Sequence, residues 1–99
     1  MELSHNREND KLTIKISGRV DTVTAPQLDK YIDDNISGVT ELIFDLSDMS
    51  YTSSAGLRVI LRAQKLMNKQ GSMKIINVKS DIMEIFDITG FTDILNFEA

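Results

Sequence analysis

Apolar residues in this 99-residue chain alternate between two periodicities, and this alternation constrains the fold more than any other feature. Leu12, Ile14 and Ile16 recur at every second position, which is typical of a strand with one buried face. Short apolar runs at 41–46 and 73–78 indicate further buried strands. Helical spacing of apolar residues separates and follows these segments, over 24–37, 55–70 and 80–89. The order strand–helix, repeated three times, predicts an α/β fold with a largely buried sheet.

Capping residues predict where each helix begins. Thr24 is expected to cap the first helix in a capping box with Gln27. Ser53 and Ser54 open the second helix, and Ser80 is expected to cap the third.

Three weaker segments complete the chain. Residues 2–7 are predicted to pair as a short strand beside 12–16, and 47–50 are predicted to form a loop. The apolar tail at 91–97 must pack against the domain, as a last short strand or a helical turn.

Composition excludes several classes of function. The chain has no cysteine, so disulfides, thiolate metal sites and cysteine nucleophiles are ruled out. The net charge of −4 argues against direct binding of nucleic acid, because phosphate binding needs a basic surface. No apolar run approaches the ~18 residues that span a bilayer, and the N-terminus has no apolar leader segment. A cytoplasmic protein without a membrane partner is expected.

Catalytic patterns are also missing. The one histidine is His5, and the serines in TSSAG lack the preceding glycine of a nucleophile elbow. The five glycines are scattered and form no phosphate-binding loop. Asp45 and Asp48, three residues apart, are more typical of turn and capping residues than of a metal pair. We therefore expect no enzymatic activity, no cofactor and no metal.

Ser53 and Ser54 allow two interpretations. A serine before a helix is most simply an N-cap, whose hydroxyl accepts a hydrogen bond from a backbone N–H. The same helix terminus also tolerates a phosphate, because its N–H groups are free and its dipole end is positive. Ala55 and Gly56 shield neither hydroxyl, and the helix-weakening Gly56 suggests a need for exposed backbone.

Three motifs resemble those of STAS-domain anti-sigma-factor antagonists. The first comprises DLS at 45–47 and YTSSAGLRVIL at 51–61. The second comprises GRVD at 18–21 and TAPQL at 24–28, and the third is IFDITGF at 85–91. The resemblance spans nearly the whole chain and implies one STAS-like domain over residues 1–99. It further implies a mixed sheet of about four strands packed with three or more helices.

The resemblance implies a partner-switching function. Such a protein binds an anti-sigma factor that is also a serine kinase, and thereby releases a sigma factor. The kinase phosphorylates a serine at the start of the second helix, which dissociates the complex, and a metal-dependent serine phosphatase reverses the modification. Matching Gly56 and Leu57 to the family's motif places the phosphoserine at Ser54, with Ser53 as the alternative. Many members carry aspartate where this chain has Ser53, which leaves a constitutive, unphosphorylated scaffold as a second hypothesis.

The expected partner surface combines the first two motifs at one end of the sheet. Its residues are Asp21, Thr22, Ser53, Ser54, Gly56 and Arg58. The second helix also carries a basic ridge, which is either a solvated face or a docking site for an acidic partner. The ridge consists of Arg58, Arg62, Lys65 and Lys69.

Overall fold

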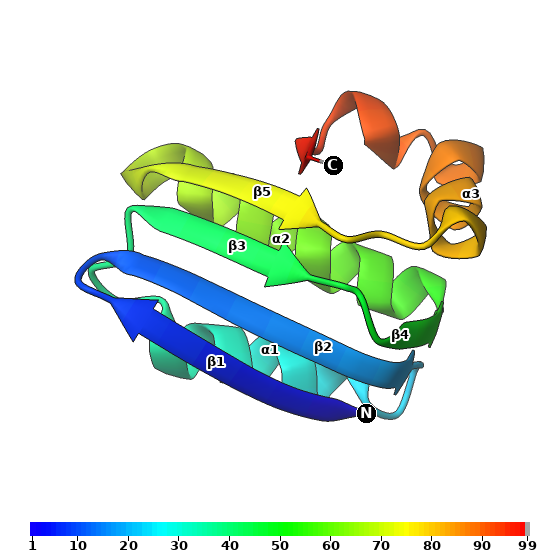
Figure 1. Ribbon diagram of the computed structural model, residues 1–99, viewed down its shortest axis with the longest axis horizontal. Coiled ribbons are helices and arrows are strands. Elements are labelled where there is room, and N and C mark those ends of the chain that lie inside the picture. Colours follow the sequence, from blue (N-terminus) through cyan, green and yellow to red (C-terminus); the bar gives the residue numbers. More distant parts are fainter. Residues whose placement is uncertain (99) are drawn as a thin grey trace.

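The computed structural model describes residues 1–98, which form one mixed sheet with its helices (Figure 1). The six strands are β1 (Glu2–Glu8), β2 (Lys11–Val20), β3 (Glu41–Asp45), β4 (Met49–Thr52), β5 (Ser72–Ile76) and β6 (Phe97–Glu98). The helices are α1 (Ala25–Asn35), α2 (Ser54–Gln70) and α3 (Ser80–Thr89), followed by the 3-10 turn η1 (Phe91–Asp93). The α/β class is confirmed, although the sheet has six strands where about four were predicted.

The sheet is mixed, as predicted. β1 and β2 form an antiparallel pair, and every other pairing is parallel, in the order β1-β2-β3-β5-β6. β4 lies off this path and pairs with the last residues of β2, beyond the end of β3. The register shifts between Gly18 and Arg19, so β2 continues past Gly18, where the sequence pattern ended it.

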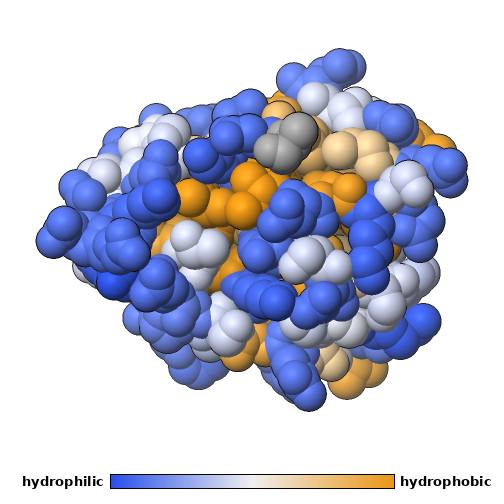
Figure 2. All heavy atoms as spheres, viewed as in Figure 1, coloured by the Kyte–Doolittle hydropathy of each residue, from blue (hydrophilic) through white to orange (hydrophobic). Residues whose placement is uncertain are grey.

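Helices cover one face of the sheet. Figure 1 shows α1 and α2 behind the strands and α3 beyond the end of β5. Leu12, Ile14 and Ile16 are fully buried on the helix side, whereas Thr13 and Lys15 are half-buried on the other. That open face is largely hydrophilic, with apolar atoms in a band across its upper half (Figure 2). Within β3, the consecutive residues Leu42, Ile43 and Phe44 are all buried, as the apolar run at 41–46 predicted, whereas β2 is only half-buried on its open face.

One strand, β4, was not predicted, and β6 was expected only as one of two alternatives for the tail. β4 occupies part of the segment assigned to a loop, because its burial pattern is not the strict alternation that marks a strand in sequence. Met49 and Thr52 are buried while the two residues between them are exposed. The apolar tail forms both expected structures, since the η1 turn precedes the short β6.

Two expected helix caps are absent. The Thr24 side chain does not cap α1, because its hydroxyl accepts a hydrogen bond from the backbone N–H of Asp21 at 2.9 Å. Ser80 is the first residue of α3 and not its cap, and the preceding Lys79 provides no side-chain hydrogen bond. Gly90 ends α3 in the left-handed region at φ 77°.

Candidate functional site

The carboxyl ends of β2 and β4 bring two distant sequence motifs together. Val20 pairs with Thr52, and the backbone N–H of Ser53 donates to the carbonyl of Val20 at 2.8 Å. The loop that begins at Asp21 and the N-terminus of α2 therefore leave the sheet side by side (Figure 1). This arrangement places the candidate residues of both motifs at one end of the sheet.

Ser53 is the N-cap of α2. Its backbone is extended, at φ −86° and ψ 174°, and its hydroxyl accepts a hydrogen bond from the N–H of Gly56 at 3.4 Å. Its carbonyl accepts the first helical hydrogen bond, from the N–H of Leu57 at 3.1 Å. Both polar groups of the half-buried Ser53 thus hold the start of the helix.

Ser54 is the first residue of α2 and is exposed. Its hydroxyl has no hydrogen-bond partner among residues 1–98. The first turn of α2 contains no acidic side chain, so the positive end of the helix dipole is not compensated there. An anionic group on Ser54 would meet favourable electrostatics in the free protein.

Gly56 is buried, which corrects the expectation that it exposes backbone. A Cβ at this position would lie 2.4 Å from the Thr52 hydroxyl oxygen and 2.8 Å from a methyl carbon of Val20. The glycine therefore lets α2 approach β2 and β4 closely. Its contribution to the candidate site is to set the position of the helix that carries Ser54.

Asp21 holds the loop between β2 and α1. One of its carboxylate oxygens accepts hydrogen bonds from the N–H groups of Val23 and Thr24, both at 3.0 Å, and from the Thr24 hydroxyl at 3.1 Å. These donors, the Thr24 N–H above all, hold the pKa of Asp21 below its ordinary value of 3.8. Asp21 is half-buried, and the neighbouring Thr22 is exposed. The carboxylate therefore holds this loop, and a contact between Asp21 and a partner stays a prediction.

The basic ridge of α2 is divided by an ion-pair network. Arg62 forms salt bridges with Asp29 and Asp33 of α1, the second at 2.8 Å, and so joins the two helices. The pKa of Arg62 is raised, chiefly by its hydrogen bond to Asp33. Arg58, one turn after Ser54, is exposed and forms no ion pair with other residues in 1–98.

Three residues at this end of the sheet were not named as site residues from the sequence. The guanidinium carbon of Arg19 lies 4.3 Å from the ring centroid of Tyr51, which is a cation–π contact between β2 and β4. Val23, in the loop after β2, is 77% exposed. The sequence pattern did not predict β4. The pairing of β2 with β4 sets Arg19 opposite Tyr51 and brings those two side chains into contact.

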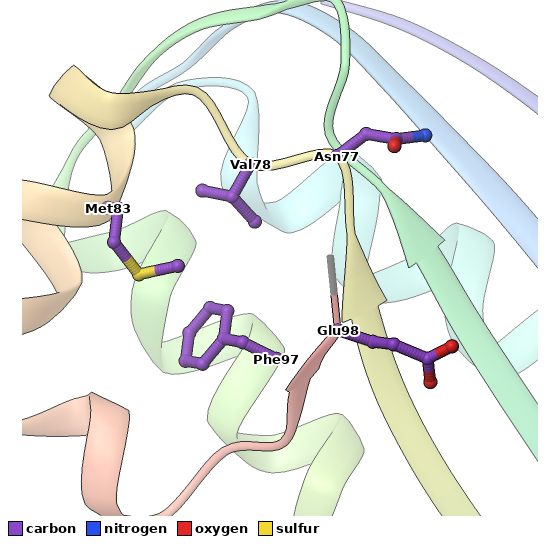
Figure 3. A pocket seen from close by; sticks show the side chains of 5 residues that line it. All are labelled: Asn77, Val78, Met83, Phe97 and Glu98. Atoms are coloured by element: carbon purple, nitrogen blue, oxygen red, sulfur yellow. The ribbon is translucent and has the colours of Figure 1, made fainter.

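A separate hollow of about 310 Å³ lies between β5, α3 and β6 (Figure 3). It is lined by Asn77, Val78, Met83, Phe97 and Glu98. The three apolar side chains point toward one another, whereas Asn77 and Glu98 point away from them. The Asn77 amide donates to Asp45 at 3.2 Å, and Glu98 pairs with Lys74 at 3.3 Å. The hollow therefore has an apolar wall and no converging polar groups that could perform catalysis.

The two aspartates considered as a metal pair have other partners. Asp48 pairs with Lys15 at 2.9 Å, and Asp45 accepts a hydrogen bond from the N–H of Ser47 at 3.0 Å. No group of three or more potential metal ligands gathers within residues 1–98. Within the same residues, no helix is long and apolar enough to cross a membrane.

Comparison with known families identifies the class of protein. The family model described as STAS domain matches residues 2–99, so this chain belongs to the STAS domain family. The anti-sigma-B factor antagonist of Bacillus subtilis is 36% identical over 93 residues, which cover 93% of this chain and 84% of that relative. Within the STAS domain family, the chain is thus related to the anti-sigma factor antagonists.

Solved structures agree on the fold. The anti-sigma factor antagonist SpoIIAA in its unphosphorylated form superposes with a TM-score of 0.78 at 16% identity, covering 99% of this chain and 88% of that one. SpoIIAA of Bacillus in the phosphorylated form gives a TM-score of 0.76 at 17% identity, covering 99% and 92%.

Proposed function

We propose that this chain is a partner-switching anti-sigma factor antagonist in which Ser54 is the switch. Unphosphorylated, it binds an anti-sigma factor that is also a serine kinase. Phosphorylation of Ser54 releases it, and a metal-dependent serine phosphatase restores the binding form. The chain acts in the cytoplasm by binding, without catalysis of its own. The observation that carries the proposal is the exposed Ser54 hydroxyl beside the capping hydroxyl of Ser53.

The hydrogen bonds favour Ser54 over Ser53 as the residue that is phosphorylated. Phosphorylating Ser53 would remove the hydroxyl that caps Gly56 and place a bulky dianion at a half-buried position. Ser54 loses no hydrogen bond within residues 1–98 when it is modified, and its position suits a negative charge. That SpoIIAA, which shares this fold, has been solved in a phosphorylated form supports a switch of this kind.

The energetics of the switch differ between the free protein and the complex. In the free protein, the phosphate meets a helix dipole worth ~0.3–1 kcal/mol, so stability is kept or rises slightly. In the complex, the phosphate is desolvated, and an unpaired buried charge costs several kcal/mol. Each ~1.4 kcal/mol is tenfold in affinity, so a loss of about a hundredfold or more is expected on phosphorylation.

The experiment measures affinity for the purified anti-sigma serine kinase from the same organism. Ser54→Ala should bind it like the wild type and resist release by ATP. Ser54→Asp should bind at least about a hundredfold more weakly and melt near the wild-type temperature. Ser53→Ala is the matched control, because it loses the N-cap and ~0.5–1 kcal/mol of stability but should still be released by ATP. Equal affinities for the wild type and Ser54→Asp would contradict the switch.

Arg58 provides a separate test of the binding surface. Arg58 is exposed, lies one turn after Ser54 and forms no ion pair within residues 1–98, so Arg58→Glu should weaken binding without lowering the melting temperature. Thr22 is also exposed at this end, and Thr22→Lys is tested in the same binding measurement. Charge reversal at Asp21 would instead disrupt the loop that its carboxylate holds. Unchanged affinity for both Arg58→Glu and Thr22→Lys would exclude this surface.

A constitutive scaffold is the second candidate function. The feature that favours it is Ser53, which stands where many family members carry aspartate. A scaffold would bind its partner equally well before and after incubation with ATP and kinase.

A further inference from the structure

Two exposed apolar side chains belong to segments that meet the N-terminus of α2 at one end of the sheet. Large hydrophobic residues with high exposure in residues 1–98 are Val23, Tyr51, Ile88 and Ile94. Val23 is in the loop after β2, and Tyr51 is in β4. β2 and β4 run parallel, and Val20 pairs with Thr52. The loop after β2 therefore begins at the same end of the sheet at which β4 ends (Figure 1). Isolated exposed apolar residues are common on protein surfaces, so exposure alone does not indicate a binding site. The contacts that fix these two side chains provide the further evidence.

Val23 is presented on a loop fixed by hydrogen bonds. Its N–H and that of Thr24 donate to the Asp21 carboxylate, and the Thr24 hydroxyl accepts from the Asp21 N–H. The N–H of Ala25 also donates to the Asp21 carbonyl, at 2.8 Å. Because the loop is already ordered, little conformational entropy remains to be lost when Val23 is bound.

Tyr51 is fixed by Arg19. The two residues pair across β2 and β4, and the guanidinium lies over the ring at 4.3 Å. An arginine stacked on a ring keeps the N–H donors at its edge available, and Arg19 forms no ion pair with another residue in 1–98. Tyrosine and arginine are enriched at the energetic centres of protein interfaces, where rigid side chains lose little entropy.

We propose that Val23, Tyr51 and Arg19 form an anchor for the anti-sigma kinase that is independent of the phosphorylation state. The partner contributes an apolar socket for Val23 and the Tyr51 ring, with a carboxylate that pairs with Arg19. Arg19 and Arg58 form no salt bridge with any of residues 1–98, although the Arg19 charge contributes to lowering the pKa of Asp21. These two cations favour an acidic partner surface even though the chain itself carries a net charge of −4. The anchor rests on the proposed function, since it concerns the same partner, and it supplies affinity that Ser54 then modulates.

The test compares Val23→Ser and Arg19→Gln with Ile94→Ser, all binding to the purified anti-sigma serine kinase. Ile94 is the matched control: it is 56% exposed and follows η1, on the way to β6. We expect about a tenfold or greater loss for Val23→Ser and for Arg19→Gln, and less than about twofold for Ile94→Ser. All three proteins should melt near the wild-type temperature, because the replaced side chains are exposed.

A second comparison separates the anchor from the switch. Ser54→Asp should weaken binding by the same factor in the wild-type and Val23→Ser backgrounds, because independent sites contribute additively. Wild-type affinity in both Val23→Ser and Arg19→Gln would overturn the anchor and leave the proposed function intact. A wild-type protein that does not bind the kinase would contradict the proposed function and the anchor together.

Discussion

Gly56→Ala tests whether close packing, and not backbone exposure, explains the glycine in the first turn of α2. The added Cβ would lie 2.4 Å from the Thr52 hydroxyl oxygen, about 1 Å inside ordinary van der Waals contact. It would also lie 2.8 Å from a methyl carbon of Val20. Thr52 is 2% exposed and Val20 is fully buried, so neither side chain can move aside into solvent.

The expected cost follows from two opposing effects. Overpacking of a well-packed core costs about 1–3 kcal/mol, whereas replacing glycine by alanine in a helix contributes at most ~1 kcal/mol in favour. Gly56→Ala should therefore lower the free energy of unfolding by about 1–2 kcal/mol, and the melting temperature of a domain of this size by at least about 4 °C. Thermal and urea unfolding, followed by circular dichroism, measure both quantities.

A second variant shows where the cost arises. In a Thr52→Ala background the hydroxyl oxygen is gone, so Gly56→Ala should destabilise less there than in the wild type. An exposed glycine would behave in the opposite way, since alanine is the better helix former. A Gly56→Ala protein that melts above the wild type would refute the packing explanation.

The other predictions concern the loop, the helix pair and a helix end. Arg62→Met should destabilise by only about 0.5–1 kcal/mol, less in high salt, because its salt bridges to Asp29 and Asp33 are partly exposed. The pKa of Asp21 is lowered in the folded protein, so Asp21 should stabilise the fold above its ordinary pKa of 3.8, and this contribution should be lost at lower pH. Unfolding measured across a pH series tests this, and Asp21→Asn should remove that part of the pH dependence. Gly90→Ala should cost about 1–2 kcal/mol by calorimetry, because residue 90 has φ 77°.

Periodicity and resemblance were sufficient to predict most of the fold. The alternation at 12–16 and the apolar run at 41–46 correspond to β2 and β3, and the long helical pattern corresponds to α2. What periodicity could not show is which faces are covered. Ile43 is only 4% exposed although it lies on the open face of the sheet, flanked in register by Thr13 and Lys74. The apolar run at 41–46 therefore predicted the burial of β3 correctly, but it did not show which elements cover each face.

The candidate site was less predictable because it depends on β4. The four residues of that strand lack a period-two pattern, yet their pairing with β2 sets Ser53 beside Val20 and Tyr51 under Arg19. The capping prediction for Thr24 was also wrong, because its hydroxyl accepts a hydrogen bond from the backbone N–H of Asp21. Such competition between backbone N–H donors for one hydroxyl is settled by backbone geometry, which spacing in the sequence does not reveal.

Locating the phosphate on the protein is the most direct test of the central claim. The wild type is incubated with ATP and the anti-sigma serine kinase, and the peptide spanning 50–58 is fragmented by mass spectrometry. We expect one phosphate, on Ser54, formed at the same site in Ser53→Ala and absent from Ser54→Ala. Phosphate on Ser53, or on neither serine while the complex still dissociates, would contradict the assignment of Ser54 as the switch.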